Sequence, residues 1–107
     1  MQRVVQERAT GQPQLLLERE GYASKTVPIT RDLITIGRDP ARDIPLAGNN
    51  ISRMHAHIEK EHDGTFSITD LSTNGTFMNG QRIPREKAIT SSGPLTVGPY
   101  RITLVMK

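Results

Sequence analysis

A hairpin pattern in the middle of the chain constrains the fold more than any other feature of the sequence. Residues 54–61 alternate between two kinds of side chain, so that His55 and His57 share one face of a predicted strand and the apolar residues share the other. The Asp-Gly dipeptide at 63–64 is typical of a tight hairpin turn, and residues 65–70 resume the alternation. The sequence therefore predicts two antiparallel strands joined by a short turn.

Similar short strands recur along the rest of the chain, with no convincing amphipathic helix between them. The predicted strands are residues 15–20, 24–29, 33–36, 44–46, 54–61, 65–70, 76–78, 81–83, 95–97 and 100–106. About ten or eleven short strands predict an all-β, antiparallel sandwich with binding loops at one end. We expect residues 1–13, which show no periodicity, to be a tail or linker before a single domain over 14–107.

The composition excludes several classes of protein. The chain has no cysteine, which rules out disulfide scaffolds, thiolate metal sites and cysteine nucleophiles and fits a reducing compartment. A net charge of +3 and four aromatic residues are too little for a nucleic-acid surface. The longest apolar run, residues 15–17, is far too short to span a bilayer, and no signal peptide opens the chain. We therefore expect a cytoplasmic protein, or a nuclear one in a eukaryote, without a nucleic-acid partner or membrane insertion.

Three predicted loops carry the donors that a phosphorylated side chain requires. A phosphomonoester has nearly two negative charges and three acceptor oxygens, and the planar guanidinium group matches those oxygens in pairs. Arg38 and Arg53 supply guanidinium groups, and Ser52 and Thr73 supply hydroxyls. A single loop arginine is usually just solvated, so the prediction depends on the combination. Asn74 has both a donor and an acceptor with which to bridge a peptide backbone.

Glycines and asparagines beside these residues also have structural explanations. Gly37 ends a predicted strand, where a missing side chain lets another loop or a ligand approach the backbone. Asn74 is equally well explained as a turn residue in a left-handed conformation before Gly75. We assign Asn79-Gly80 entirely to a second hairpin turn.

Read in chain order, three segments resemble the signature of the forkhead-associated domain, a small β-sandwich that binds phosphothreonine peptides. The segments are Gly37-Arg38, Ile51-Ser52-Arg53-Met54-His55 and Ser72-Thr73-Asn74-Gly75, and the resemblance runs from about residue 15 to the C-terminus. It implies that the phosphothreonine or its peptide contacts Arg38, Ser52, Arg53, Thr73 and Asn74, while Gly37, His55 and Gly75 support the site. Asn50 and the later loops are the candidates for reading the third residue after the phosphothreonine.

One turn departs from the family pattern. Members often have Gly-Asp before the penultimate strand, where this chain has Ser92-Gly93-Pro94-Leu95. The change concerns a sheet edge and leaves the phosphate site untouched.

The resemblance implies a phosphothreonine-dependent recognition module that tethers a phosphorylated partner in signalling. Such a module is not an enzyme, needs no cofactor or metal, and is commonly joined to other domains in a longer protein. An alternative is a phospho-independent interaction or self-association domain of the same fold, although the presence of Arg38 and Ser52 argues against a degenerate site.

Two catalytic alternatives are weaker. A metal-dependent hydrolase could be built on His55, His57 and Asp70, but no further ligand pair completes such a site. A triad of Ser52, His55 and an aspartate lacks the glycine-flanked serine of a nucleophile elbow.

Overall fold

The computed structural model describes residues 13–85, 88–89 and 94–106. This part of the chain contains eleven strands, and none of it forms a helix that could span a membrane. The strands are β1 (Pro13–Arg19), β2 (Lys25–Pro28), β3 (Leu33–Gly37), β4 (Ile44–Pro45), β5 (Ala56–Lys60), β6 (Phe66–Asp70), β7 (Phe77–Met78), β8 (Gln81–Arg82), β9 (Ala88–Ile89), β10 (Leu95–Val97) and β11 (Tyr100–Met106).

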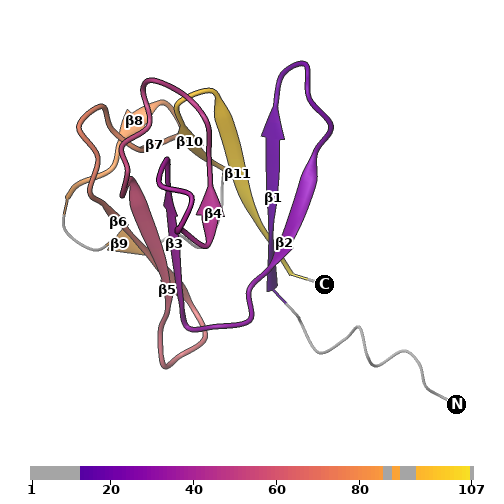
Figure 1. The fold of residues 1–107 in the computed structure, drawn as a ribbon. Helices are drawn as coiled ribbons and strands as arrows, with labels where there is room; N and C mark the ends of the chain where they lie inside the picture. Colours follow the sequence, from indigo (N-terminus) through magenta and orange to yellow (C-terminus); the bar gives the residue numbers. More distant parts are fainter. Residues whose placement is uncertain (1–12, 86–87, 90–93, 107) are drawn as a thin grey trace, which may run out of the picture.

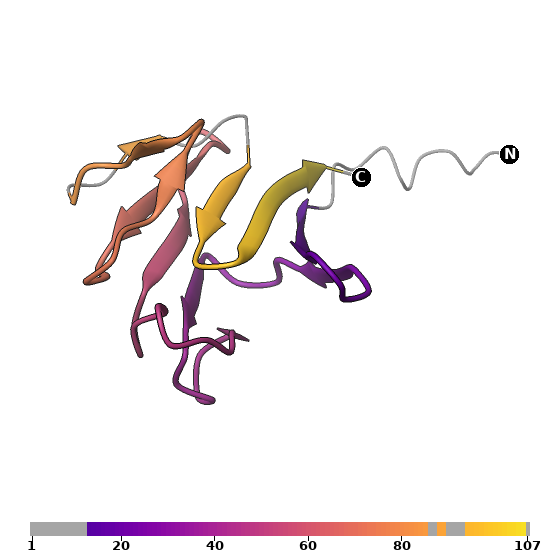
Figure 2. The same cartoon turned by 90° about the horizontal axis from the view of Figure 1, so that it is seen from above.

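The strands form two sheets that pack face to face (Figures 1 and 2). One sheet has six strands in the order β2-β1-β11-β10-β7-β8, and the other has five in the order β4-β3-β5-β6-β9. The predicted all-β sandwich is confirmed. Its pairs are antiparallel except that β3 and β4 run parallel, because the chain loops round between them and returns in the same direction.

The core lies between the sheets, where alternating residues of each strand point inward. Leu15 and Leu17 come from one sheet, and Ile34, Ile36 and Ile58 come from the other. Burying each such side chain contributes roughly 1.5–3 kcal/mol. The strand ends, and the loops that leave them, are therefore held on a rigid base.

The two predicted hairpin turns are present. In the β7–β8 turn both Asn79 and Gly80 have positive φ angles, of 54° and 80°. Two consecutive left-handed residues match the twist of a two-residue hairpin, and Asn-Gly adopts them most readily. In the β5–β6 turn Gly64 has a φ of 89°.

The alternation predicted for residues 54–61 is wrong at its beginning. Strand β5 starts at Ala56, and the residue before it, His55, is completely buried while His57 on the strand is half-buried. Burial therefore does not alternate across the start of the strand. The cause is that the two loops to which the His55 ring hydrogen-bonds cover it, as described below.

One strand and one boundary were not anticipated. Strand β9 pairs with β6 at the edge of its sheet, but two residues are too few to show alternation in a sequence. Strand β1 begins at Pro13, a position that proline tolerates as the first residue of a strand. The rest of the expected tail, residues 1–12, lies outside the described residues, as do Ser92 and Gly93 of the unusual turn.

Candidate functional site

Three loops meet at the end of the sandwich where β3 ends and β5 begins, the upper end in Figure 1. They are residues 38–43, 46–55 and 71–76, which we call the site loops. The predicted phosphate-binding residues are distributed over all three, so the fold brings together segments that are far apart in the sequence.

Hydrogen bonds centred on Ser52 tie the site loops together. Its carbonyl oxygen accepts from the Arg38 N–H at 2.9 Å, and its Oγ accepts from the Thr73 N–H at 3.1 Å. Next to it, the Arg53 carbonyl accepts from the Asp39 N–H at 3.3 Å. The arrangement holds Ser52 between the other two loops.

The close approach expected at Gly37 is present. A Cβ atom at this position would lie 2.0 Å from the Arg53 carbonyl oxygen and 2.7 Å from the carbonyl carbon. Both are backbone atoms, which cannot swing aside as the end of a side chain can. No residue but glycine therefore allows the 46–55 loop to sit against the end of β3.

Arg38 is exposed but held in place. Its Nε donates to the Ile51 carbonyl at 3.0 Å, which fixes the plane of the guanidinium group. Its two terminal amino groups contact no acceptor in the part of the chain that the structure describes. Arg38 thus keeps the paired donors that suit an incoming anion.

His55 connects two of the site loops through its ring. Nδ1 lies 3.1 Å from the Ser52 amide nitrogen, and Nε2 lies 2.9 Å from the Gly75 carbonyl oxygen. An amide N–H can only donate, so Nδ1 accepts, and Nε2 carries the proton and donates to Gly75. Burial is the main cause that lowers the pKa of His55, outweighing the opposite effect of the Gly75 hydrogen bond. The ring is therefore neutral near pH 7, and it supports the site by holding the Ser52 and Gly75 segments together.

This geometry argues against the metal-site alternative. Both ring nitrogens of His55 are engaged with the backbone, so neither is available to a metal ion unless the loops separate. Within residues 13–85, 88–89 and 94–106, no group of three His, Cys, Asp or Glu side chains could hold a metal ion.

Asp70 supports the third site loop and was missed as such in the sequence. The side chain is fully buried, and its Oδ1 accepts from the Ser72 N–H at 3.0 Å, the Ser72 hydroxyl at 2.6 Å and the Thr76 hydroxyl at 3.0 Å. Its Oδ2 lies 3.4 Å from the Arg82 Nε. Burial has the largest single effect and raises the pKa of Asp70, but the hydrogen bonds and the Arg82 charge together outweigh it and lower the pKa overall.

Ser72 links Asp70 to the rest of the 71–76 loop by hydrogen bonds. Its hydroxyl accepts from the Gly75 N–H at 2.7 Å while donating to Asp70. An aspartate two residues before a serine at a strand end is a known turn pattern, so Asp70-Leu71-Ser72 was the signal in the sequence that pointed to this role.

Thr73 and Asn74 are exposed at the tip of this loop. The Asn74 amide group donates to the Asn50 carbonyl at 3.2 Å, bridging to the neighbouring site loop. The left-handed conformation in this turn falls on Gly75, with a φ of 104°, and not on Asn74. The left-handed conformation expected of Asn74 is therefore wrong, and its side chain instead bridges two of the site loops.

A hollow lies directly beside Asn74. It is lined by Asn50, Asn74, Gly75, Phe77, Thr96 and Gly98. It extends from the site loops toward strands β7 and β10.

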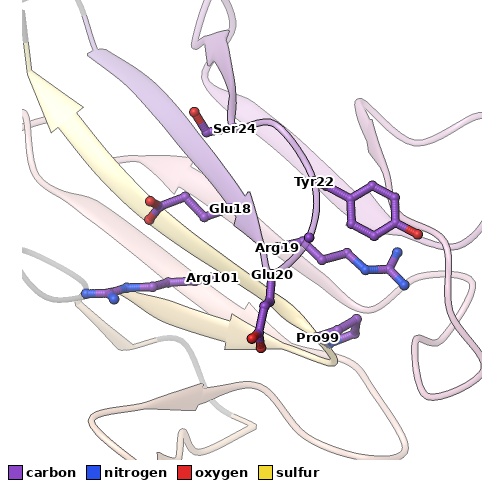
Figure 3. Close-up of a pocket in the computed structure, with 8 residues that line it drawn as sticks. Glu18, Arg19, Glu20, Tyr22, Ser24, Pro99 and Arg101 are labelled. Carbon is purple, nitrogen blue, oxygen red and sulfur yellow. The ribbon is translucent and has the colours of Figure 1, made fainter.

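A second hollow, at the β1–β2 turn, has a different character (Figure 3). Here the Arg19 guanidinium group stacks 4.4 Å from the Tyr22 ring and 5.2 Å from the Tyr100 ring. Glutamates and arginines both line it, and no residue of the site loops does. Its mixed charge does not suit a phosphate group.

A family model, the FHA domain, matches residues 34–96 of the chain. The chain belongs to the forkhead-associated domain family. The matched segment contains all three site loops, and the sequence-based family recognition, with the recognition-module function that it implies, is confirmed.

Two curated proteins illustrate how this FHA domain relates to longer chains. It is 34% identical over 97 residues to the oxoglutarate dehydrogenase inhibitor of Corynebacterium diphtheriae, covering 89% of this chain and 66% of the relative. It is 39% identical over 69 residues to the serine/threonine-protein kinase RAD53 of Saccharomyces cerevisiae, covering 60% of this chain and 8% of the kinase. The chain therefore spans less than two-thirds of either relative.

Solved structures share the fold. The FHA domain of the CT664 protein from Chlamydia trachomatis superposes with a TM-score of 0.79 at 26% identity, covering 88% of this chain and 96% of that one. The N-terminal FHA domain of S. cerevisiae Rad53p, in complex with a phosphothreonine peptide, gives a TM-score of 0.75 at 23% identity, covering 90% of this chain and 94% of that one.

Proposed function

We propose that this FHA domain binds a phosphothreonine-containing segment of a partner protein, with the phosphate group held by Arg38, Ser52, Arg53 and Thr73. Family membership supports the class of ligand, and the site loops supply the donors. The bound partner would be tethered without being chemically altered, so we infer a binding module and not an enzyme.

The state of the Ser52 hydroxyl carries this proposal. Ser52 Oγ accepts a hydrogen bond from the Thr73 amide, and its own proton has no acceptor within the described residues. A hydroxyl with a fixed oxygen and an unused proton is ready to donate to a phosphate oxygen. Arg38 is likewise held in place with donors available, because its Nε is hydrogen-bonded to Ile51 and its terminal amino groups contact no acceptor among the described residues.

The peptide around the phosphothreonine would be held by Asn74. The present bond from its amide to the Asn50 carbonyl, at 3.2 Å, is exposed and long enough to exchange for bonds to a peptide backbone. The hollow lined by Asn50, Asn74 and Phe77 then lies in the path of the following residues and would accept the third one.

The parent protein and its setting are further parts of this proposal. The curated relatives include an enzyme inhibitor and a kinase, so domains of this kind serve within proteins of different activity. We infer that this domain is joined to other domains and recruits a phosphorylated partner in the cytoplasm, or in the nucleus of a eukaryote.

Paired peptides test the proposal. A phosphothreonine peptide library would first be screened against the domain, and the best sequence then titrated in phosphorylated and unphosphorylated forms. We expect binding only with phosphate, and a large loss in Ser52→Ala, which removes the unused hydroxyl proton. Equal affinity for both forms would instead support the phospho-independent interaction domain.

A further inference from the structure

Two arginines meet at one carbonyl group on the outer side of the 71–76 loop. A terminal amino group of Arg85 donates to the Ser72 carbonyl oxygen at 2.7 Å, and one of Arg82 donates to the same oxygen at 3.3 Å. Both residues are exposed; Arg82 is the last residue of β8, and Arg85 lies three residues farther along the chain. We call Arg82 and Arg85 the arginine pair.

The positive charge of the arginine pair is only partly balanced. Arg82 lies 3.4 Å from the buried Asp70 carboxylate, whose other oxygen already accepts three hydrogen bonds. Among the described residues no acid forms an ion pair with Arg85. A guanidinium group has five N–H donors, and one shared carbonyl satisfies few of those on the pair. Donors and a net positive charge therefore remain at the surface.

This charge lies next to the phosphate site. The Ser72 carbonyl and the Thr73 N–H belong to one peptide group, and they point in opposite directions because the bond is trans. The carbonyl faces the arginine pair, while the N–H donates to Ser52 Oγ. Two hydrogen bonds and one peptide group thus separate Arg85 from Ser52, a span of roughly 8 Å or less.

We propose that the arginine pair is a second anion site, which binds a carboxylate or a second phosphate group on the same peptide as the phosphothreonine. The span matches two or three residues of extended chain, at about 3.3–3.6 Å per residue. The anion would replace water on the outward N–H groups of Arg85 and Arg82, while the Ser72 carbonyl keeps both side chains in place. This inference rests on the proposed function of the three site loops.

A scan of charged peptides tests the second site. A single glutamate would be moved through the three positions on each side of phosphothreonine in an otherwise neutral peptide, and affinities measured by titration. We expect one position to improve affinity about twofold to fivefold, the range of exposed ion pairs. Phosphoserine at that position should improve it further, because it has more charge and more acceptors, and this arm distinguishes the two sources of the anion.

Arg85→Gln is the decisive variant, because Arg82 also contacts Asp70. We expect the ratio of acidic-peptide to neutral-peptide affinity to fall toward one, because only Arg82 of the pair remains. The matched control Lys60→Gln removes the same charge at the exposed end of β5 and should keep the ratio. A ratio of one in the parent, or a ratio that survives Arg85→Gln, would overturn the second site and leave the arginine pair as loop support. Failure of the neutral phosphopeptide to bind the parent would instead overturn the proposed function.

Discussion

Arg38 shows at the scale of one residue why charge alone does not make this site. Its Nε is bound to the Ile51 carbonyl, so only the two terminal amino groups face a ligand. Lysine at this position keeps the charge but loses the planar fork, and we expect Arg38→Lys to weaken phosphopeptide binding by about 1.5–3 kcal/mol. Thermal melting should be nearly unchanged because the side chain is exposed. Normal binding with early melting would show that Arg38 is structural.

For His55 we predict the opposite of Arg38, namely a loss of stability with little direct effect on binding, because its ring is buried and hydrogen-bonds two loop segments. Its neutral form accepts from Ser52 and donates to Gly75, and both bonds would be lost in His55→Ala, at a cost of about 1–3 kcal/mol in the free energy of unfolding. Phosphopeptide binding should weaken only indirectly, through a looser 46–55 loop. A variant that folds like the parent but cannot bind would assign His55 to the ligand instead.

The pH dependence follows from the same ring. Because burial lowers the pKa of His55 from 6.5, the unfolded chain takes up a proton at a higher pH than the folded chain. The contribution of the neutral His55 ring to the free energy of unfolding is therefore complete above pH 6.5. It is lost as the pH falls from there through the folded-state pKa of His55. Denaturant unfolding at a series of pH values should show this loss in the parent, and the slope just below pH 6.5 should disappear in His55→Ala. An unchanged slope would point to another group.

At the scale of the elements, much of the fold was predictable because apolar and polar residues alternate along a strand with one buried face. The β5–β6 and β7–β8 hairpins were predicted from such period-two patterns and from the Asp-Gly and Asn-Gly dipeptides that favour tight turns. The complete burial of His55 was not predictable because it depends on ring contacts with Ser52 and Gly75, and no local pattern encodes the second of these. The contact of Asp70 with Ser72 follows a local turn pattern that was overlooked, whereas its contacts with Thr76 and Arg82 form only in the folded chain. The phosphate-site residues were predicted mainly from the family resemblance, because their chemistry alone would also fit ordinary solvent-exposed loop residues.

The end of β3 supplies a test of how elements hold the loops. In Gly37→Ala the new methyl group would meet the Arg53 carbonyl, so either β3 or the 46–55 loop must move. We expect a loss of roughly 3 kcal/mol in unfolding free energy, the upper end for overpacking, together with loss of binding. Gly64→Ala is the control, with no atom within 4 Å but a positive φ, and should cost about 1–2 kcal/mol without affecting the site. Gly37, unlike Gly64, has no positive φ, so a cost for Gly37→Ala no larger than that for Gly64→Ala would mean that a small backbone shift relieves the contact with Arg53.

At the scale of the whole molecule, salt distinguishes a directed phosphate site from a diffuse basic surface. The net charge is only +3, and two cations, Arg38 and Arg53, are assigned to the phosphate. A protein that neutralises two charges should lose about tenfold in affinity, or less, between 50 and 200 mM salt, whereas six to ten phosphate contacts cost about a thousandfold or more. Titrating one neutral phosphothreonine peptide over this range would measure the slope, and the acidic peptide should give a steeper one if the arginine pair takes part. A thousandfold loss for the neutral peptide would mean that the domain reads charge density, and the hydrogen bonds centred on Ser52 would then not be the source of its affinity.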